Sequence, residues 1–141
     1  PDRMEEELFG VEGDSGKPKS VGLLERAHGG TLMFDEVGDM PLETQGKILR
    51  VLVDQRFRRV GGDAPVSVDV RIVSTTSRDL LADAGNGRFR EDLYHRLNVV
   101  PVPAPSLAER RDDIPALTAY FIDRIARGAG FPKRALTSEA M

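Results

Sequence analysis

A short apolar run that ends in two adjacent carboxylates is the feature of this chain that most restricts its fold. Thr31 to Phe34 read Thr-Leu-Met-Phe, and Asp35 and Glu36 follow at once. The run is too short for a core helix, so it predicts a strand. In an open parallel sheet, side chains at the carboxyl end of a strand are rigidly held and still reach the crevice where ligands bind. We therefore expect Asp35 and Glu36 to face such a crevice.

The rest of the chain alternates helical and strand patterns. Pro41 suits the first turn of a helix, and apolar residues recur at helical spacing to about Phe57. Apolar and polar residues alternate from Val66 to Ile72, which predicts a strand. Further strand and helix expectations follow from the same patterns: a strand over 98–102, helices over 4–9, 22–27, 79–84, 89–97 and 113–127, a loop over 11–21, and a helix starting at Thr137.

Strands that alternate with helices predict an α/β fold with a parallel sheet flanked by helices. Prolines at positions 101, 103 and 105 then interrupt the chain. We expect a boundary there, between an α/β part over 1–105 and the start of a helical part over 106–141.

The composition excludes several classes of function. The chain of 141 residues carries 20 basic and 23 acidic side chains, no cysteine and 2 histidines. The acidic balance excludes a generally basic nucleic-acid-binding module, and the lack of cysteine excludes disulfides and cysteine zinc sites. No apolar run approaches the ~18 residues of a membrane span, and no signal peptide is visible. We expect a cytoplasmic protein without a membrane partner.

The two carboxylates are candidates for nucleotide chemistry. An aspartate in the place of Asp35 can hold Mg²⁺, directly or through water, and the metal bridges the β- and γ-phosphates of a nucleotide. Glu36 is aimed differently and can polarise an attacking water. The alternative is that both acids merely begin a loop and cap the helix at Pro41.

Three hydroxyl side chains follow the strand that ends near Ser74. They are Thr75, Thr76 and Ser77. If this strand lies beside the first one, the hydroxyls lie near the same crevice, where a polar side chain can sense a γ-phosphate. The alternative is that they cap the turn into Asp79.

Two arginines near the predicted helix over 89–97 are a further candidate pair. Arg90 and Arg96 are six residues apart, so on an ideal helix they point about 120° away from each other and form no common stripe. Two arginines at a subunit edge can each reach a neighbour's phosphate, as arginine fingers do. The alternative is a solvated face on which they pair with Glu91 and Asp92.

Seven motifs follow one another along the chain. They are residues 7–10 (ELFG), 28–41 (HGGTLMFDEVGDMP), 47–52 (KILRVL), 59–62 (RVGG), 69–72 (DVRI), 89–99 (FREDLYHRLNV) and 107–114 (LAERRDDI). In combination and in this order, they resemble the central AAA+ ATPase domain of sigma-54-dependent transcriptional activators, including its Walker B region. The resemblance covers nearly the whole chain and is specific because the motifs follow in the right order.

The resemblance implies a P-loop NTPase of the AAA+ type that works as a ring hexamer, hydrolyses ATP with Mg²⁺ and remodels RNA polymerase holoenzyme. By position, Asp35 is implied to hold Mg²⁺ and Glu36 to orient the hydrolytic water. Arg90 and Arg96 are implied to be fingers offered to the next subunit.

The same resemblance places Thr76 and Ser77 at the first sensor of the nucleotide, where the family usually has Thr-Asn. Ser77 is a departure from that pattern. A hydroxyl has a shorter reach than an amide, so the resemblance leaves γ-phosphate sensing open.

Two parts of the family's ATPase core are expected to lie outside these residues. The Walker A loop lies upstream of Glu7 in the family, and the second sensor lies downstream of Met141. We therefore expect residues 1–105 to be the back part of the α/β subdomain and residues 106–141 to be the start of its helical lid. On this reading the 141-residue chain alone binds ATP poorly or not at all.

The family's sigma-contacting loop bears a GAFTGA signature, which is absent from residues 11–21. Its loss resembles the NtrX branch, the nitrogen-related response regulators of two-component systems. That branch implies a receiver domain served by a sensor histidine kinase and a helix-turn-helix that binds DNA, both outside this chain. Two functions stay open: an ATPase that drives a transcription complex, and a nucleotide-gated oligomerisation module without productive hydrolysis.

Overall fold

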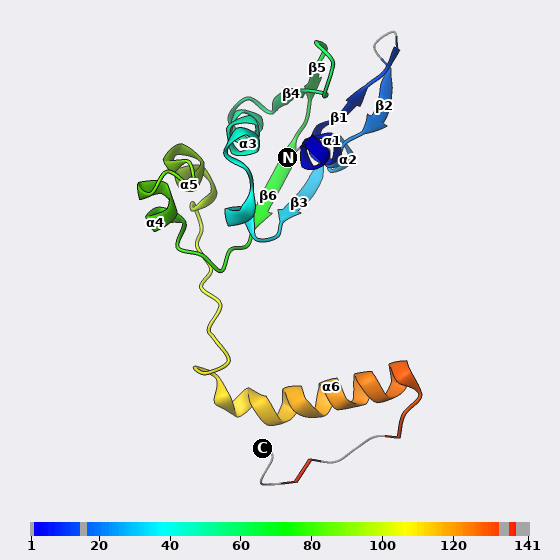
Figure 1. Cartoon of the computed structure of the whole chain (residues 1–141), viewed down its shortest axis with the longest axis vertical. Helices are drawn as coiled ribbons and strands as arrows, with labels where there is room; N and C mark the ends of the chain where they lie inside the picture. The colour runs from blue at the N-terminus through cyan, green and yellow to red at the C-terminus, as the bar shows by residue number, and fades with distance from the viewer. Residues whose placement is uncertain (1, 15–16, 133–135, 138–141) are drawn as a thin grey trace. The chain divides into compact units, whose positions relative to one another are not determined.

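The computed structural model describes residues 2–14, 17–132 and 136–137. The chain divides into two compact units, Pro1–Pro101 and Val102–Met141. The first unit is a mixed α/β structure, as predicted, and it contains a parallel strand pair (Figure 1).

The strand that precedes the two carboxylates lies beside the strand that precedes the three hydroxyls. These strands are β3 (Gly30–Phe34) and β6 (Val70–Ser74), and they run parallel, with Phe34 opposite Ser74 (Figure 1). Because both strands end at the same level, the residues that follow them emerge at one edge of the sheet. The condition that the sequence left open, that the two strands are neighbours, is therefore met.

Helices supply the core around this strand pair. They are α1 (Asp2–Phe9), α2 (Leu23–Arg26), α3 (Leu42–Asp54), α4 (Leu80–Gly85) and α5 (Glu91–Leu97). The most deeply buried apolar side chains are Leu24, Ile48 and Leu93, which α2, α3 and α5 contribute. A short 3-10 turn, η2 (Val37–Asp39), connects the carboxylates to α3. Asp79 accepts hydrogen bonds from the amides of Leu81 and Ala82, which makes it the N-cap of α4.

The expected loop over 11–21 is wrong, because this segment contributes two strands. β1 (Gly10–Glu12) pairs in antiparallel fashion with β2 (Pro18–Val21). The hairpin is held from outside its own sequence: the amide of Glu12 donates to the Val60 carbonyl at 2.9 Å, and Arg59 donates to the Glu12 carboxylate at 3.0 Å. Long-range partners thus overrode a glycine-rich local pattern.

The single strand expected over 66–72 is in fact two strands. β4 (Arg56–Arg58) pairs with β5 (Pro65–Ser67), and β6 begins only at Val70. Between them, the Val68 amide donates to the Gln55 carbonyl at 2.9 Å, outside either ladder. Apolar and polar residues still alternate across this break, although β5 pairs with β4 and β6 pairs with β3.

The strand expected over 98–102 is wrong for the described structure. Val99, Val100 and Val102 are exposed, and the segment has no ladder partner among the described residues. Pro101 and Pro103 lack the N–H that a ladder needs. A β-branched composition alone therefore does not produce a strand here.

The second unit consists of η3 (Arg111–Asp113) and α6 (Ile114–Ala129), which confirms the helix predicted over 113–127. Gly130 ends α6 in the left-handed conformation, with φ at 68°. The helix expected after Thr137 lies outside the described residues. No helix in the described ranges combines the length and apolarity needed to cross a membrane.

Candidate active site

The parallel register brings Asp35 and Thr75 together at the end of the strand pair. The Thr75 hydroxyl donates to Asp35 Oδ1 at 2.5 Å, and the Glu36 amide donates to the same hydroxyl at 3.0 Å. The amide of Val37 donates to the Thr75 carbonyl at 2.9 Å. Thr75 therefore holds the Asp35 carboxylate and the backbone of Glu36, and the Asp35 side chain remains exposed to solvent.

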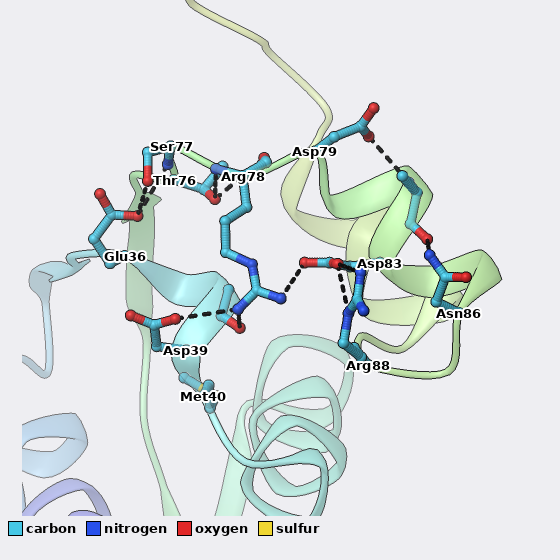
Figure 2. A network of polar contacts seen from close by, with 12 residues as sticks. Glu36, Asp39, Met40, Thr76, Ser77, Arg78, Asp79, Asp83, Asn86 and Arg88 are labelled. Carbon is cyan, nitrogen blue, oxygen red and sulfur yellow. Dashed lines mark hydrogen bonds and ion pairs between the residues drawn. The ribbon is translucent and has the colours of Figure 1, made fainter.

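Glu36 adopts a backbone conformation that is uncommon for a residue with a side chain. Its φ of 50° and ψ of 57° lie in the left-handed region. Such a conformation costs of order 1–3 kcal/mol and persists where the surroundings over-determine it. Here the surroundings include Ser77, whose amide and hydroxyl donate to Glu36 Oε2 at 2.9 and 3.1 Å (Figure 2).

The structure separates the residues expected at the first sensor. Ser77 contacts Glu36, whereas the Thr76 hydroxyl donates to the Arg78 carbonyl at 3.4 Å and accepts from the Arg78 amide at 3.1 Å. The neighbour Thr75, which received no role of its own from the sequence, touches both acids. Thr75 and Ser77 contact the two acids, whereas Thr76 contacts only the backbone of Arg78 among the bonds described. No period in the sequence distinguishes them, because the strand ends at Ser74 and the chain bends at Ser77.

The oxygen groups at this strand end fit a hard cation. Asp35 and Glu36 offer carboxylate oxygens, the ligand type that Mg²⁺ prefers. Among the described residues, no group of three or more acids and histidines gathers to form a cage. Mg²⁺ usually keeps several waters and binds one or two carboxylates plus substrate phosphates, so a single aspartate at this edge is a sufficient protein ligand.

Arg78 fastens the turn after Glu36 to α4. Its Nη1 donates to the Gly38 carbonyl at 3.1 Å and to Asp39 Oδ1 at 3.2 Å, and its Nη2 lies 2.6 Å from Asp83 Oδ2 (Figure 2). Asp83 is buried and also accepts from Arg88, at 2.9 Å from Nε and 2.7 Å from Nη2. The hydrogen bond from Arg88, with help from Arg78, holds the pKa of Asp83 below its ordinary value. Sequence reasoning missed Arg78 and Asp83, because a lone charge in a weak helical pattern gives no signal of its partner.

Both predicted finger arginines lie on the surface of their own chain. Arg90 is the N-cap residue of α5 and donates to both oxygens of Asp92, at 3.0 and 2.7 Å, and this bond lowers the pKa of Asp92. Arg96 donates from Nη2 to the Leu52 carbonyl at 3.0 Å. In the part of the chain that the structure describes, no hydrogen bond or ion pair joins either arginine to Asp35 or Glu36. Their role as fingers stays a prediction, and neither is buried.

Comparison with known proteins shows the family. Residues 1–103 match the family described as the sigma-54 interaction domain. The nitrogen assimilation regulatory protein NtrX of Azorhizobium caulinodans is 55% identical over 141 residues, which is 100% of this chain and 31% of the relative. The transcriptional regulator NtrC of Escherichia coli K12 is 49% identical, over 98% of this chain and 30% of its own length.

Solved structures agree with these relatives. NtrX from Brucella abortus in complex with ADP matches with a TM-score of 0.90 and 56% identity, covering 98% of this chain and 31% of that one. The same protein in complex with ATP matches with a TM-score of 0.86, covering 98% and 30%. This chain thus spans less than a third of the length of these relatives. It belongs to the sigma-54 interaction domain family of AAA+ proteins, in the branch of NtrX-like nitrogen regulators.

Proposed function

We propose that this chain is part of a two-component response regulator that controls nitrogen-related transcription. The regulator is a cytoplasmic protein that hydrolyses Mg-ATP at the subunit boundaries of a ring. The observation that carries the proposal is the pair of carboxylates at the end of β3, braced by hydroxyls that follow β6. The structures of NtrX from Brucella abortus with ADP and with ATP support nucleotide binding by this family member.

The two acids receive different roles because their partners differ. Asp35 keeps an exposed carboxylate at the edge of the sheet and would hold Mg²⁺, which neutralises phosphate charge when it is bound. Glu36 is held by its left-handed backbone and by both donors of Ser77. A carboxylate fixed in this way can accept a proton from a water that attacks phosphorus.

The remaining roles extend to parts beyond these residues. Arg90 and Arg96 would reach the nucleotide of the next subunit in a ring, which we expect to be a hexamer. A histidine kinase would act through a receiver domain, and DNA would bind a helix-turn-helix. The β1–β2 hairpin stands where the family contacts its sigma factor, and it lacks the GAFTGA signature. Contact with RNA polymerase holoenzyme would therefore use different residues.

A second function is favoured by one contact. The Ser77 hydroxyl already donates to Glu36, so it is engaged by the carboxylate instead of facing a phosphate. This arrangement suits a nucleotide-gated oligomerisation module that binds ATP and hydrolyses it poorly. Such a module would position DNA-binding domains without remodelling a sigma-54 complex.

Removal of the metal distinguishes the two functions. In the full-length protein we expect ATP turnover, measured as phosphate release, that excess EDTA abolishes and added Mg²⁺ restores. Sedimentation in the same buffers follows assembly. Assembly that responds to ATP without phosphate release would favour the second function. If ATP causes neither assembly nor phosphate release, both functions are contradicted.

Ser77 and Thr76 provide a matched pair of hydroxyls. We expect Ser77→Ala in the full-length protein to lower kcat roughly tenfold, because one hydrogen bond to a charged group is lost while the amide bond to Glu36 remains. Thr76→Ala should retain most of the turnover, since Thr76 makes no described contact with either acid. Equal values of kcat for the two variants would contradict the role given to Ser77.

A further inference from the structure

Two polar connections join the turn that carries Glu36 to the residue that carries the predicted finger. Both start at η2 or its flanking residues and end between Arg88 and Arg90. The described structure therefore links these two places through side chains that the sequence assigned to no site.

The first connection is Gln45 of α3, whose side chain is fully buried. Its Nε2 donates to the Met40 carbonyl at 2.7 Å and to the Arg88 carbonyl at 3.4 Å. Its Oε1 accepts from the Arg90 amide at 2.8 Å. Met40 closes η2, which starts directly after Glu36, so one amide group holds the end of that turn and the backbone of Arg90 at once.

The second connection is the ion triad of Arg78, Asp83 and Arg88 (Figure 2). Arg78 holds the Gly38 carbonyl on one side and Asp83 on the other. Asp83 receives Arg88 through its carboxylate, and its backbone carbonyl accepts from the Arg88 amide at 2.9 Å. The triad spans from the turn after Glu36 to Arg88, two positions before Arg90.

Gln45 and Asp83 are buried, whereas the Arg78 and Arg88 side chains are partly exposed, so the stiffness of the connections rests on the two buried groups. A buried amide or carboxylate that loses its partner pays the cost of desolvation without compensation, so each group keeps its partners in place. Arg90 is the N-cap residue of α5, and its amide is one of the groups held. The backbone of Arg90 is therefore connected to η2 through buried groups.

We propose that Gln45 and the Arg78–Asp83–Arg88 triad are positioning residues that couple the turn at Glu36 to the Arg90 finger of the same chain. The inference rests on the proposed function, in which Glu36 serves the chain's own site and Arg90 serves the next one. It assigns this chain a route by which the state of one site adjusts the finger offered to the neighbouring site.

The first test is a double-mutant cycle in the full-length protein. Asp83→Asn keeps the shape of the side chain and removes its charge. We expect kcat for ATP to fall by about 10²-fold with little change in KM, because a displacement of about 1 Å in a catalytic group can cost that much. Asp63→Asn is the control, since Asp63 is fully exposed and its only described ion pair, with Arg58, spans 3.6 Å.

The cycle decides whether Asp83 acts through Arg90. In an Arg90→Ala background, Asp83→Asn should add no further loss, because the group that it positions is already gone. Losses that multiply would overturn the proposal. A kcat unchanged by Asp83→Asn in the otherwise wild-type protein would also overturn it.

Amide hydrogen exchange tests the coupling without any turnover. Arg78→Gln removes the link between the Gly38 carbonyl and Asp83 but leaves Arg88 on Asp83, so it is a milder change than Asp83→Asn. We expect faster exchange over 88–97 in Arg78→Gln, and over the same residues in Gln45→Met, but not in Asp63→Asn. Unchanged exchange over 88–97 in Arg78→Gln would overturn the proposal. If the variants show this exchange pattern and the wild type shows no ATP turnover, the proposed function fails while the coupling stands.

Discussion

Replacement of Glu36 with glutamine is expected to lower the ATP turnover of the full-length regulator by about 10²-fold or more while ATP still binds. Glutamine has nearly the same shape, and its carbonyl oxygen can still accept from the amide and hydroxyl of Ser77. The turn after β3 should therefore persist, and the change isolates the loss of the carboxylate as a proton acceptor. Phosphate release measures kcat, and titration of a fluorescent ATP analogue measures binding.

Glu43→Gln is the matched control for this experiment. Glu43 is an exposed acid in the first turn of α3, and its described partner is Lys47 in an i,i+4 ion pair. A surface pair of this kind contributes little, so the control should keep wild-type turnover. Equal turnover of Glu36→Gln and the wild type would remove the catalytic assignment of Glu36.

The part of the fold that carries the acids could be predicted because its signals are local. The apolar run over 31–34 ends at Asp35, and the alternation that leads to Thr75 has the period of a strand. An α/β pattern predicts parallel strands, but it left open whether these two strands are neighbours. Their pairing, with Phe34 opposite Ser74, is known from the structure.

The hairpin over 10–21 and the valines of 98–102 could not be predicted, because their state depends on distant partners. β1 is held by Val60 and Arg59, which lie almost fifty positions away. The valine segment has strand composition, yet no described strand offers it a ladder. Strand propensity measures how well a side chain fits a pleated, half-buried surface, so β-branched residues form a strand only where a neighbouring strand is available.

The same distinction applies to the site. The position of Asp35 and Glu36 directly after a predicted strand identifies them as candidates, whereas no sequence pattern distinguishes Gln45 and Asp83 from other helix residues. Gln45 reaches the Arg90 amide across 45 positions in sequence. Only the packed positions of α3, α4 and α5 turn these polar groups into connections, so no local pattern could have selected them.

Replacement of Arg90 with alanine is expected to lower ATP turnover by about 10³-fold or more if Arg90 is a finger. The structure sharpens this prediction, because the described partner of Arg90 is Asp92, and both side chains are about half-exposed. An exposed ion pair of this kind contributes little to stability. The variant should therefore keep its thermal unfolding midpoint while it loses kcat, whereas a role confined to the solvated face would leave both unchanged.

Mixing two inactive variants tests which subunit Arg90 serves. An Arg90→Ala subunit keeps its own Glu36, and a Glu36→Gln subunit keeps its own Arg90. In rings with head-to-tail interfaces formed at equal concentrations, about a quarter of the sites would combine both intact groups, so activity should return on mixing. Arg50→Ala, at an exposed position of α3, is the control and should be active alone. If the mixture stays as inactive as its components, Arg90 does not act across a subunit boundary. Its side chain then serves only the ion pair with Asp92. The contacts of Gln45 and Asp83 would in that case stabilise the start of α5 and would not position a finger.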